Sequence, residues 1–122
     1  MSARPTFVLL LALAIGSAAR AGPADVTAAT AQCAESVCRF VVTVRHADAG
    51  WDHYADAWQV IGPDGAVIAT RELRHPHVDE QPFTRDLRGV AIPPGVTRVR
   101  IRARDSVHGF GGAEVEVALP GR

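Results

Sequence analysis

From residue 37 onward the sequence alternates between apolar and polar side chains in short runs, and this period of two limits what the chain can fold into. In the stretch CRFVVTVRH (38–46), Phe40, Val42 and Val44 fall on one side of an extended chain, and polar residues fall on the other. Similar runs predict strands at 54–62, 66–75, 82–92, 97–105 and 113–120, with the turn signals PDG and PPG between two pairs of them. No ten-residue window has an apolar stripe of helical period, so the pattern predicts an all-β chain.

Six short strands with turns between them predict a small antiparallel β-sandwich of immunoglobulin-like or fibronectin-like architecture. The alternative is a small β-barrel made of the same strands. The cysteine–tryptophan–cysteine spacing of true immunoglobulin domains is absent from the sequence. We expect a single domain at 37–120. A flexible lead-in is expected at 22–36, because its first residues are small and polar and show no periodicity.

The first 21 residues have the parts of a secretion signal. Arg4 precedes an apolar stretch at 7–16 that is too short to span a bilayer, and Ala-Arg-Ala at 19–21 fits the small-x-small rule for cleavage. We therefore expect a signal peptide at 1–21, a periplasmic or secreted protein, and no stable membrane insertion after cleavage. Retention of this stretch as a membrane anchor is the alternative.

The charge balance gives no case for a nucleic-acid partner. The full chain has 13 Lys+Arg and 13 Asp+Glu, and removal of Arg4 and Arg20 leaves 11 against 13, a net charge of −2 with histidine neutral. Four arginines do alternate with apolar residues along 97–105. We expect a solvated ion-pair face there, with Arg104 opposite Glu114 and Arg102 opposite Glu116. The sequence makes no prediction about a protein partner.

The two cysteines, Cys33 and Cys38, lie close together in the sequence CAESVC. In an oxidising compartment such a pair predicts a local disulfide. A metal role is the alternative, but zinc knuckles favour C-x2-C with a second pair. The C-x-x-C motif of thioredoxin-like redox sites is absent from the chain.

The histidines fall in alternate connections of the predicted strands. Successive strands of an antiparallel array run in opposite directions, so the connections at 46–53, 75–81 and 105–112 should lie at one end of the domain. These connections hold all five histidines of the chain: His46, His53, His75, His77 and His108. The sequence therefore predicts a histidine-rich end.

The spacing of these histidines suits metal ligation. His75 and His77 are two residues apart, so in extended chain their side chains point to the same side, with Cα atoms about 7 Å apart. Pro76 stiffens this pair. We rank His75, His77 and His108 first as ligands, followed by His46 and His53. Carboxylates that could orient these imidazoles or ligate themselves are Asp48, Asp52, Glu80 and Asp105. With several imidazoles and no free thiolate, the expected ion is one Cu(II) or Zn(II).

Three other interpretations of the same loops stay open. Trp51, Tyr54 and Phe110 lie in or beside them and could contact a non-metal ligand such as a sugar or a peptide. The histidines could instead pin the loops through side-chain to backbone hydrogen bonds. A third function is a metal-dependent hydrolase, with Glu80 or Asp52 as general base. No nucleophile motif accompanies the histidines, so we assign no catalytic residue.

The segments WDHYADAWQVIGPDG, HPHVDEQPFTR and DSVHGFGG, taken together, resemble a family of small, secreted bacterial proteins of uncharacterised function. The resemblance covers roughly residues 40–120, most of the mature chain. It implies a shared fold and an extracytoplasmic setting. It implies no activity.

Overall fold

The computed structural model describes residue 3 and residues 22–122, so the predicted signal peptide lies outside the described residues apart from Ala3. The strands are β1 (Asp25–Ala34), β2 (Val37–Arg45), β3 (Ala55–Ile61), β4 (Val67–Glu72), β5 (Phe83–Ala91), β6 (Arg98–Asp105), β7 (Gly109–Phe110) and β8 (Val115–Ala118). Within this described part the chain forms no helix that is long and apolar enough to cross a membrane.

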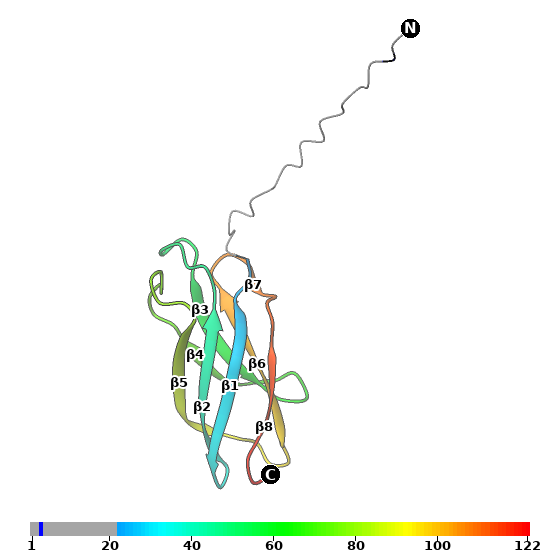
Figure 1. The fold of residues 1–122 in the computed structure, drawn as a ribbon. Coiled ribbons are helices and arrows are strands. Elements are labelled where there is room, and N and C mark those ends of the chain that lie inside the picture. The colour runs from blue at the N-terminus through cyan, green and yellow to red at the C-terminus, as the bar shows by residue number, and fades with distance from the viewer. Residues whose placement is uncertain (1–2, 4–21) are drawn as a thin grey trace.

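The strands form two antiparallel sheets that pack face to face (Figure 1). One sheet has the order β1-β2-β5. The other has the order β4-β3-β6, and β7 and β8 both pair with the free edge of β6 at different heights. The sheets are not closed into a barrel, so the prediction of a small immunoglobulin-like or fibronectin-like sandwich is confirmed.

The core lies between the inner faces of the two sheets, as the alternation predicts. Phe40, Val42 and Val44 of β2 are all 0% exposed, and they face Trp58 of β3 and Ile101 of β6, which are also 0% exposed. Burial of such side chains contributes about 1.5–3 kcal/mol each. The apolar positions that set the period of two are thus the ones that join the two sheets.

The prediction of a flexible lead-in at 22–36 was wrong, because β1 occupies most of that segment. β1 pairs with β2 along its whole length, from Asp25 opposite Arg45 to Ala34 opposite Val37. Its residues are mostly small, and on its own such a segment has little tendency to form a strand. The strand is stabilised instead by its hydrogen bonds to β2 and by the burial of Val26 (2% exposed).

The arginine row forms ion pairs, but in a different register from the one we predicted. Arg100 lies opposite Glu116 in the backbone pairing, and its guanidinium contacts Glu114 at 2.6 Å. Arg98 contacts Glu116 at 2.7 Å. The shift arises because β7 pairs with the end of β6 and places Phe110 opposite Arg104. β8 therefore pairs with β6 two residues away from the predicted register.

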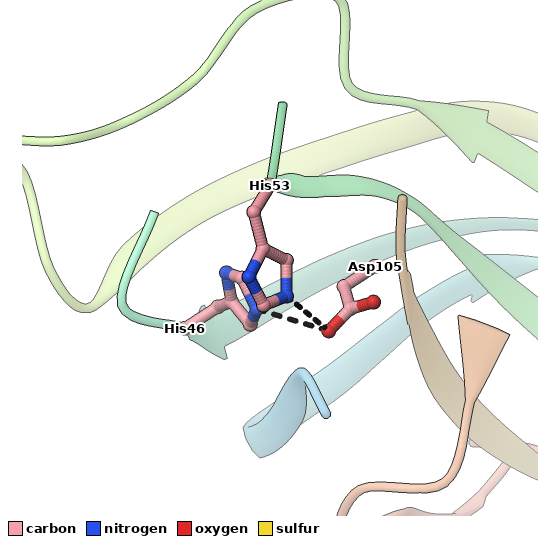
Figure 2. Close-up of side chains that lie close together, drawn as sticks. All are labelled: His46, His53 and Asp105. Carbon is pink, nitrogen blue, oxygen red and sulfur yellow. Dashed lines mark hydrogen bonds and ion pairs between the residues drawn. The ribbon is translucent and has the colours of Figure 1, made fainter. Parts of the chain in front are cut away.

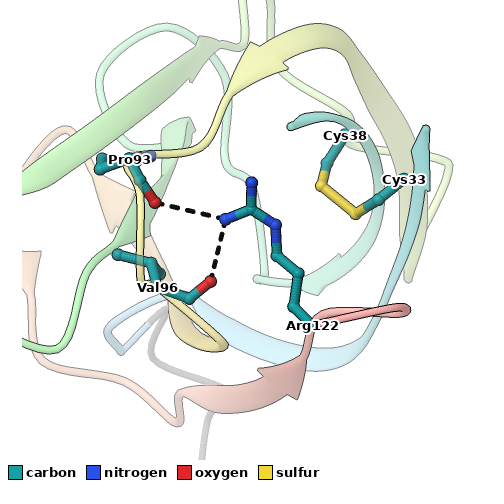
Figure 3. Close-up of a disulfide and its surroundings, with 5 residues drawn as sticks. All are labelled: Cys33, Cys38, Pro93, Val96 and Arg122. Carbon is teal, nitrogen blue, oxygen red and sulfur yellow. Dashed lines mark hydrogen bonds between the residues drawn. A yellow bond between two sulfur atoms is a disulfide. The ribbon is translucent and has the colours of Figure 1, made fainter. Parts of the chain in front are cut away.

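The disulfide closes the β1–β2 hairpin, at the end of the sandwich opposite the histidine-bearing loops. Cys33 and Cys38 are opposite one another in the backbone pairing, and their sulfurs are bonded (Figure 3). Beside this hairpin, Arg122 donates to the carbonyl oxygens of Pro93 (3.3 Å) and Val96 (3.2 Å) (Figure 3). The predicted local disulfide is confirmed.

Replacement of both cysteines by serine is expected to lower the free energy of unfolding by about 2 kcal/mol, the loop-closure contribution of so short a loop. Urea unfolding of the double variant and of the oxidised protein measures this difference. The NMR signals of the histidine imidazoles should stay unchanged, because the disulfide is at the far end of the sandwich. A change in those signals would show that the two ends are coupled.

Candidate metal centre

The loops that carry the histidines meet at one end of the sandwich (Figure 1). His46 directly follows β2, His53 precedes β3, and Asp105 is the last residue of β6. β2 belongs to one sheet, and β3 and β6 to the other. Side chains from both sheets therefore meet across the open end of the sandwich.

His46, His53 and Asp105 form the compact group of this end (Figure 2). Each offers one potential ligand atom, and the three atoms lie within 4.8 Å of one another. Nε2 of His46 and Nε2 of His53 each lie 3.1 Å from Oδ2 of Asp105. The side chains of His46 and Asp105 are 0% exposed and that of His53 is 18% exposed. A metal ion could be held here, with His53 on the solvent side.

A third imidazole reaches the same oxygen. Nδ1 of His108 is 2.9 Å from Oδ2 of Asp105, and its side chain is 42% exposed. The other carboxylate oxygen, Oδ1, accepts hydrogen bonds from the backbone amides of Val107 (2.9 Å) and His108. The two oxygens of Asp105 therefore have different partners. Oδ1 accepts backbone amides of the turn after β6, and Oδ2 faces the three imidazole nitrogens.

Asp105 is held in its ionised form. Burial, the largest influence, raises its pKa, but the backbone and side-chain hydrogen bonds from His108, the side chain of His53 and the amide of Val107 outweigh it. The pKa of Asp105 is therefore well below its usual range. A carboxylate must be ionised to ligate a metal ion, so this setting prepares Asp105 for that role.

A second buried carboxylate orients His46. Nδ1 of His46 is 2.5 Å from Oδ1 of Asp48, and both side chains are 0% exposed. The amides of Ala55 and His77 donate to Asp48 at 3.0 and 2.7 Å and fix that carboxylate in turn. In the tautomer that donates Nδ1–H to Asp48, the lone pair of His46 Nε2 faces Asp105. Carboxylate–histidine–metal arrangements use this pattern.

Two fully buried carboxylates, Asp48 and Asp105, lie beside the imidazole of His46. If His46 is neutral and donates to Asp48, its Nε2 lone pair faces the carboxylate oxygen of Asp105 at 3.1 Å, which is repulsive. Either a second proton on His46 or a cation beside Nε2 relieves this repulsion. The two fully buried carboxylates, with neutral imidazoles, carry a charge of about −2 that a divalent ion would balance.

The nitrogen-to-oxygen distances are close to those between ligands of a tetrahedral ion, but shorter. Zinc bonds nitrogen and oxygen at about 2.0–2.2 Å, so neighbouring ligand atoms of a tetrahedron lie about 3.3–3.5 Å apart. The three nitrogen-to-Oδ2 distances are 3.1, 3.1 and 2.9 Å, slightly shorter than that.

Two of the three histidines that we ranked first, His75 and His77, lie apart from this group. The ring of His77 stacks on Phe83, with centroids 4.1 Å apart, and its Nε2 is 2.8 Å from a guanidinium nitrogen of Arg85. The ring of His75 lies 4.7 Å from that of His77. A guanidinium beside His77 opposes binding of a cation, so the geometry favours His46, His53 and Asp105 instead.

Of the remaining carboxylates that we singled out, only Asp48 contacts a histidine of the group. Glu80 pairs with Arg85 at 2.9 Å. Asp52 is exposed. We predicted Asp105 as one of four carboxylates that could orient the imidazoles or ligate themselves, and in the structure it belongs to the candidate metal-binding group itself. Its signal in the sequence was the position at the end of a strand, three residues before His108, where an Asp side chain commonly accepts amides of the following turn.

The aromatic residues of this end do not form one platform. Trp51 is 67% exposed and meets the ring of Tyr54 edge-on, with centroids 5.6 Å apart. Phe110 lies under the guanidinium of Arg102, 4.0 Å from the ring centroid. Trp51 and Tyr54 therefore form one pair, and Phe110 packs separately on the neighbouring strand.

Comparison with known proteins gives one relative and no family. No protein-family model and no solved structure matches the chain. A protein of Halomicrobium mukohataei named "Putative lipoprotein" is 44% identical over 78 residues, which is 64% of this chain and 38% of the relative. The chain thus spans well under half of that protein's length. Its printed name states no ligand and no activity.

Proposed function

We propose that this protein acts outside the cytoplasm and binds one transition-metal ion, Cu(II) or Zn(II), at the open end of the sandwich. His46, His53 and Asp105 are the proposed ligands. The ion and its ligands would join the two sheets across that end.

One observation carries the proposal. One nitrogen of His46, one nitrogen of His53 and one oxygen of Asp105 lie within 4.8 Å of one another, and the other oxygen of that carboxylate already accepts hydrogen bonds from backbone amides. Imidazole and carboxylate ligands without thiolate suit both ions, and the general order of stability favours Cu(II) over Zn(II).

The extracytoplasmic setting has two supports. The Cys33–Cys38 disulfide is typical of proteins in oxidising compartments. The protein of Halomicrobium mukohataei that this chain resembles is named "Putative lipoprotein", which agrees with an extracytoplasmic setting. The signal peptide expected at 1–21 would deliver the chain there, as the resemblance to secreted proteins also implies.

The test is a calorimetric titration with Zn(II), and separately with Cu(II), of the wild-type protein and of the His53→Ala variant. His53 is part-exposed, so the fold should tolerate its loss. We expect one ion per chain with a Kd tighter than about 10 μM, and at least about tenfold weaker binding in the variant.

His75→Ala is the matched control. It removes an exposed imidazole from the same end of the molecule, outside the proposed group. Its metal affinity should stay within about twofold of the wild-type affinity, a change well below tenfold, or about 1.4 kcal/mol. Wild-type binding weaker than about 10 μM contradicts the proposal. Equal affinity in the wild type and His53→Ala contradicts it as well.

A second candidate function is a binding module for a non-metal ligand, and the exposure of Trp51 favours it. A tryptophan that is 67% exposed and braced edge-on by Tyr54 is suited to stacking on a sugar or on an apolar peptide side chain. A glycan or peptide that binds the wild type but not Trp51→Ala, with His53→Ala unaffected, supports this function. A screen without binders counts against it.

A further inference from the structure

A hollow lies beside the histidine-bearing end, where the edges of the two sheets meet. It lies between the end of β4, the loop that follows β4, and β5, and has a volume of about 160 Å³. The residues that line it are Arg71, Leu73, Arg74, His75, His77 and Arg85. Five of the six carry a cationic or imidazole side chain, and none carries a carboxylate.

The positive charge of this hollow is only partly neutralised. Within the described part of the chain, Arg71 and Arg74 form no ion pair with a carboxylate, and Arg85 pairs with Glu80 at 2.9 Å. Like charges gathered at short range repel one another unless an opposite charge lies among them. Two guanidinium groups without a carboxylate partner thus leave an excess of positive charge in the hollow.

Two of the arginines are held in place by other groups. Nε of Arg71 donates to the backbone carbonyl of Asp86 on β5 at 3.0 Å, and another of its nitrogens donates to the carbonyl of Glu72. Arg85 is fixed by contacts to His77 and Glu80 of 2.8 and 2.9 Å. The donors that remain on these guanidinium groups are therefore already positioned, which lowers the entropy cost of binding a ligand.

His77 adds an independent observation. Its residue is 7% exposed, and a guanidinium can only donate, so Nε2 of His77 accepts from Arg85 and the ring proton of a neutral imidazole is on Nδ1. Nδ1 is buried and has no hydrogen-bond partner among the described residues. Burial, then Arg85 and His75, lower the pKa of His77, which keeps the ring neutral. A buried N–H donor without an acceptor is costly.

We propose that this hollow binds a small oxyanion, a phosphate or carboxylate group, through Arg71, Arg74, His75 and Arg85, with His77 in its wall. Guanidinium groups bind such anions through paired hydrogen bonds. The hollow is smaller than the 300 Å³ or so of a typical small-molecule site, so it fits a single anionic group. The three guanidinium groups exclude a metal cation from the same place.

This inference does not depend on metal binding at His46, His53 and Asp105. The two sites lie on opposite sides of Asp48, which contacts the imidazole of His46 with Oδ1 and accepts the backbone amide of His77 with Oδ2. Failure of one site therefore leaves the other to be tested on its own.

The experiment titrates the protein with inorganic phosphate, and separately with acetate, and follows the imidazole signals by NMR. A chelator keeps the protein free of metal, and the ionic strength is held constant. We expect a saturable shift of the His77 ring signal with at least one anion, and an apparent pKa of His77 that rises with saturation, because a nearby negative charge favours the protonated ring. Binding of phosphate alone or acetate alone assigns the anion. No saturable shift with either anion overturns the proposal.

Arg74→Gln is the diagnostic variant, because Arg74 is exposed and its loss should not disturb the fold. A charge-assisted hydrogen bond contributes enough that we expect about 10-fold weaker anion binding in this variant. Arg88→Gln is the control. It also removes one positive charge, but from a side chain on β5 that is 78% exposed and lies outside the hollow. Equal weakening in the two variants would mean that general charge, not this hollow, attracts the anion, and would also overturn the proposal.

Discussion

Substitution of Asp105 by asparagine is expected to lower the affinity for Cu(II) and Zn(II) at least about 100-fold, the upper range seen when only a supporting residue of a metal site is lost. The amide keeps the shape of the side chain, and its oxygen can still accept the amides of Val107 and His108. Its nitrogen would face the three imidazoles in place of Oδ2, and it is a poor ligand for either ion. Calorimetric titration and the shift of Tm on metal addition measure the effect.

Asp52→Asn is the matched control for this substitution. It makes the same chemical change in an exposed residue of the loop that joins β2 and β3, next to His53 in sequence. Its metal affinity should equal that of the wild type. If Asp105→Asn binds either ion as tightly as the wild type does, Asp105 is not a ligand and the proposed centre is wrong. Amide NMR spectra of both variants establish that each one is folded.

The largest expected change in stability comes from Trp58→Ala, which should lower the free energy of unfolding by about 3–5 kcal/mol. Trp58 is 0% exposed and fills the space between the sheets, so its removal leaves a cavity as well as losing buried area. For a domain of this size the loss corresponds to a fall in Tm of about 12–40 °C. Thermal and urea unfolding measure it.

Trp51→Ala is the matched control, because it makes the same substitution at the other of the chain's two tryptophans. Trp51 is 67% exposed, so its replacement should change the stability by no more than about 0.5 kcal/mol. A cost of Trp58→Ala below about 1 kcal/mol would mean that the sheets can close over the cavity. A large cost at Trp51 would mean that the exposed pair with Tyr54 holds the loop in place.

The strands and the end of the domain that carries the histidines could be predicted because both follow from local pattern. Residues such as Phe40, Val42 and Val44 mark a buried face by their spacing alone. Antiparallel alternation then assigns the connections to the two ends, whatever the order of strands in the sheets. The unpredicted β1 precedes all the predicted strands, so it did not alter that assignment.

β1 and the register of β8 could not be predicted, because each depends on a partner strand. The small side chains of β1 give little strand signal, and β1 forms because β2 offers an unpaired edge. Similarly, β8 shifts against β6 because the short β7 occupies the end of that edge. Neither effect is visible in the residues of the strand itself.

By itself, the sequence determined the all-β sandwich, the local disulfide and the concentration of histidines at one end, since each depends on residues close together in the chain. The tertiary structure alone decided which histidines converge. His46 and Asp105 are 59 residues apart and belong to different sheets, so their contact depends on how the sheets pack. His75 and His77 have the better local spacing, but Phe83 and Arg85 hold the ring of His77 and set it among arginines. Spacing along the chain gives the reach of a side chain, and the surrounding charges decide whether a cation or an anion can bind there.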